Sequence, residues 1–292
     1  MTDPRWYNLS ENKSATQRST VKCNGCQDGS YIAGQAVDTS SKTCTRTVLV
    51  ELSDPFKTQW WMVDLQEIKS IYAIRFSFRD YDGHHIRQQQ RLSGYTIFVS
   101  NSPEIKSGEL CFQHNETNLP SLTAQHVCVS FGQYVQFINE RITYIELCSL
   151  VVLGCNRGFY GVDCSHPCPE HCKSNQCFVT NGICPACANG YTGSDCNQAC
   201  SSGMFGPDCS LFCSGHCKNN STCNPTNGVC SNGCIDGWMD MFCNKSCVAG
   251  RFGPDCKNDC SGNCLNDVIC DSKTGKCDNG CKPGYKGDLC NN

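Results

Sequence analysis

The sequence predicts an all-β protein in two parts, a β-sandwich followed by small modules held together by disulfides. The chain has 292 residues and 30 cysteines, of which six lie in residues 1–154 and twenty-four in residues 155–292. The first part carries runs of alternating apolar residues, and the second carries an eight-cysteine pattern three times. We call these parts the head (1–154) and the repeats.

In the head, large apolar residues alternate with other residues at the period of a β-strand. The predicted strands are 61–65, 71–78, 95–99, 134–138 and 143–147. Segments rich in Gly, Pro, Asn and Asp separate them, and no stretch shows a sustained helical periodicity. We expect at least one of Trp60 and Trp61 in the core of a sandwich, which a chain of this length can build.

The repeats span 155–199, 200–246 and 247–292. The second and third share the spacing C-x8-C-x3-C-x3-C-x5-C-x6-C-x3-C-x8-C, and the first differs only by two shorter gaps. Such short units bury too little apolar surface to fold on a core, so cross-links must replace it. The pairing stays open, because eight cysteines allow 105 pairings.

Composition places the protein in an oxidising, extracellular compartment. Repeated CxxC pairs, as in zinc sites, are missing, so disulfides are favoured over metal. Glycosylation sequons agree and begin at Asn8, Asn12, Asn115, Asn219, Asn220 and Asn244. The net charge of −3 gives no nucleic-acid footprint. No apolar run is long enough for a signal peptide or a membrane span, so we expect a fragment whose membrane segment, if any, lies outside this chain.

Enzyme classes are disfavoured by the residue inventory. The sequence contains no G-x-S-x-G elbow, no phosphate-binding loop and no H-E-x-x-H pair. Its seven histidines are scattered, and every cysteine has a plausible disulfide partner, so no nucleophile stands out. We therefore expect a binding protein without catalytic residues.

The repeats resemble EGF-like modules of the laminin-type, eight-cysteine form. Their closing pattern is C-x2-G-aromatic, as in residues 281–285, and a Phe-Gly-Pro-Asp-Cys turn recurs at 205–209 and 252–256. This combination is similar to multiple-EGF-domain engulfment receptors and class F scavenger receptors. The resemblance implies a cell-surface protein that binds particle or cell-surface ligands. The calcium-binding variant of the EGF entry pattern is absent.

The head resembles the F-type lectin (fucolectin) domain. The opening at 8–17 and the segments Ala-Val-Asp (36–38), Cys-Thr-Arg-Thr (44–47), Trp-Trp-Met-Val-Asp-Leu (60–65) and Arg-Leu-Ser-Gly-Tyr (91–95) follow in family order. The resemblance implies a discoidin-type, galactose-binding-like jelly roll that binds L-fucose and holds a structural calcium. The family's cysteine positions imply three bridges, Cys44–Cys148, Cys111–Cys128 and, from the leftover pair, Cys23–Cys26.

The family's fucose site uses one histidine and two arginines, and this sequence departs from that pattern. Arg46 stands where the histidine is expected, and Arg79 and Arg91 bracket a longer segment in which Asp82 lies near the expected aspartate. The sugar-site residues implied are therefore Arg46, Arg79, Asp82 and Arg91, with His84 or His85 as a substitute imidazole. Forked guanidinium donors suit sugar hydroxyls. The alternative is a solvated basic loop with arginines at strand ends.

The calcium loop of the lectin family is partly present. Asp38, Ser40 and the carbonyl of Cys148 match ligand positions, but the acidic residue after the cysteine is replaced by Ser149. Calcium favours six to eight oxygen ligands, carboxylates among them. The sequence therefore leaves one structural calcium in the head open, with an Asx-type turn at Asp38 as the alternative.

Together these features predict an extracellular recognition protein, a fragment of a scavenger- or engulfment-type receptor ectodomain with a lectin-like head and an EGF-like stalk. Its expected partners are glycans or glycoproteins, fucose-type ones included. One alternative is a secreted fucose-binding immune lectin. Another is a structural matrix or adhesion protein that binds no sugar.

Overall fold

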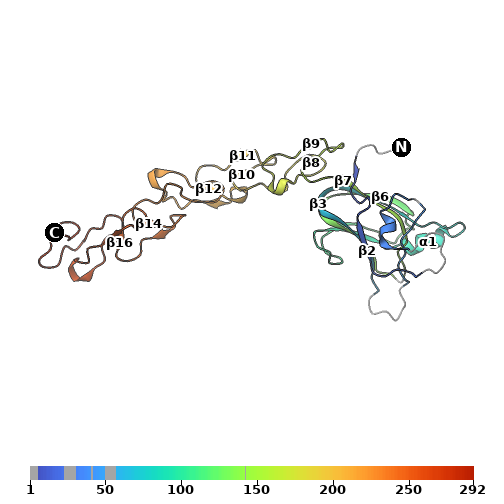
Figure 1. Ribbon diagram of the computed structural model, residues 1–292, viewed down its shortest axis with the longest axis horizontal. Coiled ribbons are helices and arrows are strands. Elements are labelled where there is room, and N and C mark those ends of the chain that lie inside the picture. Colours follow the sequence, from blue (N-terminus) through green and yellow to red (C-terminus); the bar gives the residue numbers. More distant parts are fainter. Residues whose placement is uncertain (1–5, 23–30, 41, 50–56, 142) are drawn as a thin grey trace. The chain divides into compact units, whose positions relative to one another are not determined.

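The computed structural model describes residues 6–22, 31–40, 42–49, 57–141 and 143–292 (Figure 1). The chain divides into two compact units, one of residues 1–168 and 175–183, the other of residues 169–174 and 184–292. The division falls inside the first repeat. Strand β7 (Leu147–Cys155) explains this, because it carries the head's sheet directly into the first cysteine of that repeat without a linker.

The head is built around one seven-stranded antiparallel sheet in the order β1-β7-β3-β6-β4-β5, with β2 also paired to β3. Besides β7, its strands are β1 (Tyr7–Asn8), β2 (Ser14–Gln17), β3 (Gln59–Phe78), β4 (Thr96–Ser100), β5 (Glu109–Gln113) and β6 (Thr123–Asn139). The first half of β3 pairs with β2 and its second half with β7, across register shifts between Asp64 and Ala73. Strand β3 therefore belongs with its first half to one layer of the head and with its second half to another.

Both halves of β3 face a single apolar core. Trp61 and Val63 from the first half share one cluster with Ile74 and Phe76 from the second, and all four are almost fully buried. Since strand side chains alternate between faces, this sharing makes the head a β-sandwich, as predicted. Trp61 is the buried member of the tryptophan pair, and its Nε1–H donates to the Ala33 carbonyl over 2.9 Å.

Two predictions of secondary structure are wrong. The segment 79–95, expected to lack a helix, contains α1 (His85–Leu92), which buries Gln88 and Leu92 one turn apart. Residues 143–146 are not a strand, since β7 begins at Leu147. Instead, Ile145 is held by Thr47. The Ile145 N–H donates to the Thr47 hydroxyl over 2.9 Å, and the Thr47 N–H donates to the Ile145 carbonyl over 3.0 Å.

The repeats contain little regular structure. Their short elements are β8 (Phe159–Tyr160), β9 (His166–Pro167), β10 (Tyr191–Thr192), β11 (Gln198–Ala199), β12 (Met204–Phe205), β13 (Leu211–Phe212), β14 (Trp238–Met239), β15 (Lys245–Ser246), β16 (Arg251–Phe252) and β17 (Asn258–Asp259). The 3-10 turns of the chain are η1 (Ala33–Ala36), η2 (Lys173–Asn175), η3 (Pro207–Cys209), η4 (Lys218–Asn220) and η5 (Leu265–Asp267). Two-residue hairpins of this kind need support from cross-links.

Each repeat pairs its cysteines in the same way: first with second, third with fifth, fourth with sixth and seventh with eighth. In the second repeat the bridges are Cys200–Cys209, Cys213–Cys223, Cys217–Cys230 and Cys234–Cys243. In the head, the structure pairs Cys44 with Cys148 and Cys111 with Cys128. Cys23 and Cys26 lie outside the described residues. Every cysteine that the structure describes is paired.

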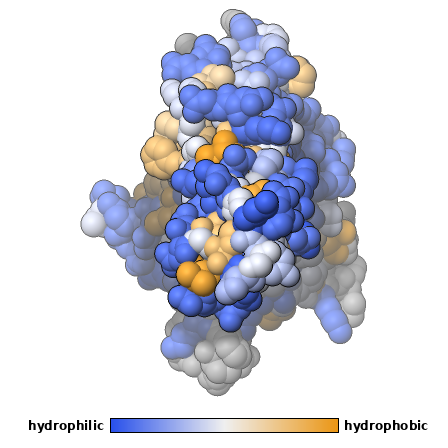
Figure 2. Space-filling model, turned by 90° about the vertical axis from the view of Figure 1, so that its left-hand side faces the viewer, coloured by the Kyte–Doolittle hydropathy of each residue, from blue (hydrophilic) through white to orange (hydrophobic). Residues whose placement is uncertain are grey.

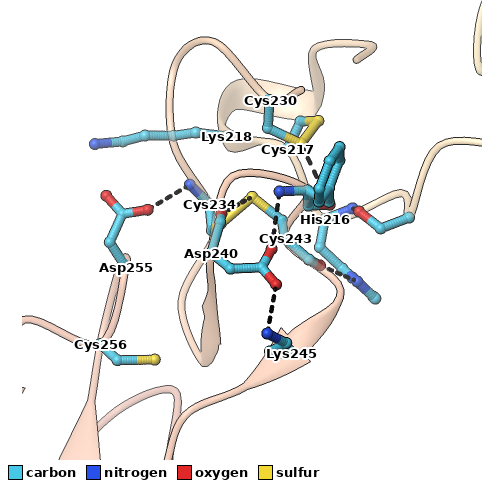
Figure 3. The surroundings of a disulfide bond; sticks show 12 residues. His216, Cys217, Lys218, Cys230, Cys234, Asp240, Cys243, Lys245, Asp255 and Cys256 are labelled. Carbon is cyan, nitrogen blue, oxygen red and sulfur yellow. Dashed lines mark hydrogen bonds and ion pairs between the residues drawn. A yellow bond between two sulfur atoms is a disulfide. The ribbon is translucent and has the colours of Figure 1, made fainter. Parts of the chain in front are cut away.

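In the second repeat, Trp238 packs against the buried cysteines and stacks on His216, which Figure 3 shows beside the disulfides. His216 lies 3.6 Å from the Trp238 ring, and its Nδ1 is 3.2 Å from the Cys243 carbonyl. In the third repeat Asn263 takes the histidine's place and donates from Nδ2 to the Cys290 carbonyl over 3.2 Å. In the second and third repeats, the residue before the fourth cysteine therefore contacts the carbonyl of the last cysteine and anchors the final loop.

Candidate functional site

The candidate site lies where residues 45–47 run beside residues 145–147. The Thr45 N–H donates to the Leu147 carbonyl over 2.8 Å, and Thr45 and Thr47 are fully buried. Alternation of side chains along an extended segment then turns Arg46 away from the core. Arg46 is half-buried on the opposite side, beside Tyr144.

A buried carboxylate supports the site from below. Glu146 is inaccessible to solvent, and its Oε1 accepts from the Tyr81 hydroxyl over 2.6 Å while Oε2 lies 3.5 Å from Gln88 Nε2. Burial and the bond to Glu146 raise the pKa of Tyr81. Burial lowers the pKa of Arg46, but the charge of Glu146 and the neighbouring tyrosines outweigh it and the pKa ends above its usual value. The guanidinium of Arg46 is therefore charged at any physiological pH.

Two guanidinium groups stack on one tyrosine. The Cζ atoms of Arg46 and Arg91 lie 4.5 and 4.4 Å from the centre of the Tyr144 ring. Arg91 Nη1 also donates to Gln88 Oε1 over 2.8 Å and to the Tyr144 hydroxyl. Helix α1 makes this possible, because it places Gln88 and Arg91 three residues apart on one face.

These groups line a pocket of about 300 Å³, which we call the arginine–tyrosine pocket. Its residues are Arg46, Tyr81, His84, Arg87, Gln88, Arg91 and Tyr144. Guanidinium groups supply fixed hydrogen-bond donors, and tyrosine rings supply apolar faces. The pocket is therefore equipped to hold a polar ring compound that carries hydroxyl or acidic oxygens.

The four predicted sugar-site residues do not converge. Arg79 lines a different pocket of about 630 Å³ together with Asp80 and His85, whose Nδ1 lies 2.9 Å from an oxygen of that aspartate. The Arg79 guanidinium points into this other pocket because it donates to the Lys42 carbonyl over 3.3 Å and lies 3.2 Å from Cys44 Sγ. Asp82 is exposed and lines neither pocket. Of the two candidate imidazoles, His84 reaches the arginine–tyrosine pocket and His85 does not line it.

Sequence reasoning missed five residues of this site, which are Tyr81, Arg87, Gln88, Tyr144 and Glu146. A signal for Gln88 exists, since residues 87, 88 and 91 have the spacing of one helical face. For Glu146 no comparable signal exists, because an acidic residue in an apolar run reads as an outward-facing strand position.

The loop at Asp38 carries more oxygens than the sequence suggested. Asp38 Oδ1 accepts from the Ser40 N–H over 3.0 Å, which is an Asx turn. The Thr43 hydroxyl lies 2.7 Å from Asp38 Oδ2 and 3.4 Å from the Ser40 carbonyl, so it joins the same group of oxygens. The Cys44–Cys148 bridge ties this loop to the start of β7. The group still contains only one carboxylate, and the described residues contain no cluster of three or more acidic, histidine or cysteine ligands.

Comparison with known families gives one match. The NedA-like, galactose-binding domain family matches residues 35–137, which lie within the head. With the antiparallel sandwich described above, this places the head in the discoidin-like, galactose-binding class of β-sandwiches. The comparison with curated proteins gave no match.

Several solved structures are similar to the head. The serum f-lectin (fucolectin) of the striped bass Morone saxatilis is 23% identical, with 51% of this chain and 47% of that chain covered and a TM-score of 0.40. A chitosan-binding module from a Paenibacillus sp. chitosanase/glucanase is 21% identical over 51% of this chain and 99% of that chain, with a TM-score of 0.38. The lectin domain of lectinolysin, complexed with Lewis B antigen, is 19% identical over 51% and 97%, with a TM-score of 0.37.

Proposed function

We propose that this is an extracellular, non-enzymatic recognition protein whose head binds glycans in the arginine–tyrosine pocket. The observation that carries the proposal is the pair of guanidinium groups, from Arg46 and Arg91, stacked within 4.5 Å of one tyrosine ring. Sugar hydroxyls accept hydrogen bonds from such donors, and the apolar face of a sugar ring packs against aromatic carbons. The galactose-binding family match over 35–137 covers both arginines and supports this reading.

The repeats fit the role of a stalk. We infer that they are EGF-like modules of the kind that scavenger and engulfment receptors carry, on the basis of their closing C-x2-G-aromatic pattern and their common pairing. On the face shown in Figure 2, the surface is mainly hydrophilic and apolar residues form small separate areas. Such a surface suits a solvated spacer whose contacts with particle or cell-surface ligands are polar.

The disulfide bonds support an extracellular location. The described cysteines are all in disulfides, which persist in oxidising, extracellular surroundings. Within the described residues, no helix combines the length and the apolar composition that crossing a bilayer requires.

A glycan array probed with the full oxidised chain, in calcium and again in chelator, tests the proposal. We expect binding that Arg46→Ala and Arg91→Ala abolish, each variant being checked by its melting temperature. Arg79→Ala is the matched control, because this arginine lines the other pocket. A signal lost in Arg79→Ala alone would move the site to that pocket. A blank array from folded protein would rule out glycan binding and leave a matrix or adhesion protein without sugar specificity.

We also propose a structural calcium at the Asp38 loop. Asp38, Ser40, Thr43 and the Cys148 carbonyl are the oxygens that would hold it, with water completing the shell. Calcium titration should raise the melting temperature of the full chain, and Asp38→Asn should remove that rise while leaving the calcium-free melt almost unchanged. An equal rise in the variant would exclude this loop.

A further inference from the structure

We propose that the arginine–tyrosine pocket selects acidic saccharides, with a sugar carboxylate or sulfate bound by Arg46. This inference rests on the proposed glycan-binding function and names its ligand class. Two observations carry it. The charged residues that line the pocket are cationic, and the guanidinium of Arg46 contacts aromatic rings but has no hydrogen-bond acceptor among the described residues.

The charge around the pocket is unbalanced. Arg46, Arg87 and Arg91 line it, and no carboxylate is among the residues that do. Glu146 lies beneath, but it is fully buried and its oxygens face the Tyr81 hydroxyl and Gln88. A ligand entering from solvent therefore meets cationic groups, and the buried Glu146 is already hydrogen-bonded within the protein.

Arg46 is half-buried, and its side chain makes no hydrogen bond or ion pair within the described part of the chain. Its backbone is bonded, since the N–H donates to the Tyr31 carbonyl and the carbonyl accepts from Val21 N–H, each over 3.1 Å. Among the described residues its guanidinium contacts only aromatic rings, those of Tyr144 at 4.5 Å and Tyr31 at 6.0 Å. A guanidinium carries five N–H donors, and ring faces do not satisfy them in its plane. This half-buried fork is therefore open to an anionic acceptor.

Arginines elsewhere in the chain show what this one lacks. Arg141 donates to Glu116 over 2.6 Å, and Arg251 lies 2.9 Å from Asp259. Both pairs are exposed, where a carboxylate partner adds little. The pocket instead brings the half-buried Arg46 and Arg91 together with the exposed Arg87, and within the described chain no carboxylate lines it. A bidentate carboxylate or sulfate gains more at such partly buried guanidinium groups.

The rest of the pocket points to a sugar as the carrier of that anion. Its volume of about 300 Å³ is small for a ligand site and suits one ring. The Tyr144 and Tyr81 rings, the Gln88 amide and the His84 imidazole line it as well. Inorganic phosphate would leave these apolar and neutral polar groups without partners.

Isothermal titration of the full chain with matched ligands tests the inference. The probes are a trisaccharide ending in N-acetylneuraminic acid, the same trisaccharide with its carboxylate reduced to an alcohol, and a galactose-6-sulfate glycan beside its unsulfated form. We expect each acidic probe to bind about tenfold or more tightly than its neutral match, with affinity falling as salt rises. Arg46→Ala should weaken the acidic probes by about 10–100-fold and the neutral ones little.

Variants and competitors separate the outcomes. Arg46→Lys keeps the charge without the fork and should recover part of the affinity, whereas Arg75→Ala, an exposed arginine on β3, should have no effect. Equal binding of neutral and acidic probes would overturn the inference and leave glycan binding intact. Binding of none by folded protein would overturn both. Equally strong competition by phosphate or a glutamate-rich peptide would also overturn it, since the pocket would then take any anion.

Discussion

The head and the repeats reach a stable interior by opposite routes. In the head, large side chains such as Trp61, Phe76 and Phe137 form one apolar cluster. In the second repeat the buried cluster consists of five cysteines, against which Phe205, Cys213 and Trp238 are only partly buried. Apolar area stabilises a fold by removing surface from water, while a cross-link acts mainly by restricting the unfolded chain. The difference predicts that the two parts tolerate different substitutions.

The largest contrast should come from removing one disulfide in each part. Cys217→Ser with Cys230→Ser opens a bridge of separation 13 in the second repeat, and Cys111→Ser with Cys128→Ser opens one of separation 17 in the head. Similar separations imply a similar entropic cost, about 3 kcal/mol. We expect the second repeat to lose most of its amide protection, because only its three remaining bridges and no apolar core would then hold it, and the head to keep a cooperative melt at a lower temperature. Hydrogen exchange measured by mass spectrometry reports both parts at once.

A core substitution should reverse that pattern. Trp61→Ala removes a fully buried ring and its bond to Ala33, which should cost about 3–5 kcal/mol in the head. Trp60→Ala, one residue away on the other face of the strand, is the control and should cost far less because Trp60 is only partly buried. Chemical denaturation followed by exchange in both parts measures this. Loss of protection in the repeats would show that they depend on the head's core.

Glycine positions in the third repeat allow a finer test. Gly275 and Gly262 have φ of +75° and +76°, so alanine is strained at both by a similar amount, about 1–2 kcal/mol. Only at Gly275 would the new Cβ meet a ring, that of Phe252 at 2.5 Å. We therefore expect Gly275→Ala to lower the melting temperature of the repeats more than Gly262→Ala. Equal shifts would mean that the ring moves aside freely.

The sequence predicted the architecture better than the site. Cysteine spacing marks the repeats because cross-links need fixed positions, and alternation marks strands such as 71–78 because one face of a sheet is buried. Helix α1 was missed because only Gln88 and Leu92 of its eight residues are buried, which leaves too short a periodic signal.

The site could not be read from motif positions alone. Arg46 and Arg91 meet because residues 45–47 bond to 145–147 and α1 turns between Arg79 and Arg91, and both features depend on tertiary contacts. The placement of Arg79 illustrates this dependence. Arg79 has the residue type that the motif requires, but its guanidinium is drawn to the Lys42 carbonyl and the Cys44 sulfur.

The stability of the head should depend on pH through one half-buried histidine. Burial, with a contribution from the neighbouring His114, lowers the pKa of His126, whose Nε2 lies 2.8 Å from the Tyr95 hydroxyl. The folded head then binds a proton less readily than the unfolded chain, so its stability falls as pH drops below the ordinary histidine value of about 6.5. His126→Gln should flatten this fall in melts between about pH 7.5 and 5. An unchanged slope in the variant would assign the effect to other groups.

The smallest expected effect concerns how successive repeats join. Asp255 of the third repeat accepts from the Cys234 N–H of the second over 2.8 Å (Figure 3), whereas Asp208, in the equivalent turn, is exposed. A physical reason is the residue before the seventh cysteine. It is Gly233 at the bonded junction, where a Cβ would lie 2.9 Å from Asp255 Oδ2, and alanine at the other junction.

The two aspartates make a matched pair, because both have positive φ, 53° and 50°, and alanine strains both alike. Asp255→Ala should therefore speed exchange of the Cys234 amide by the value of one hydrogen bond, about 0.5–1.5 kcal/mol, and Asp208→Ala should leave the equivalent amide unchanged. The bond to Cys234 holds the pKa of Asp255 below its usual 3.8, so this protection is present above that value and is lost as pH falls through the lowered pKa. Exchange measured by NMR across that range should show the loss in the wild type and not in the variant. If both amides respond equally, the junctions are equivalent and the glycine before the cysteine has no role in joining the repeats.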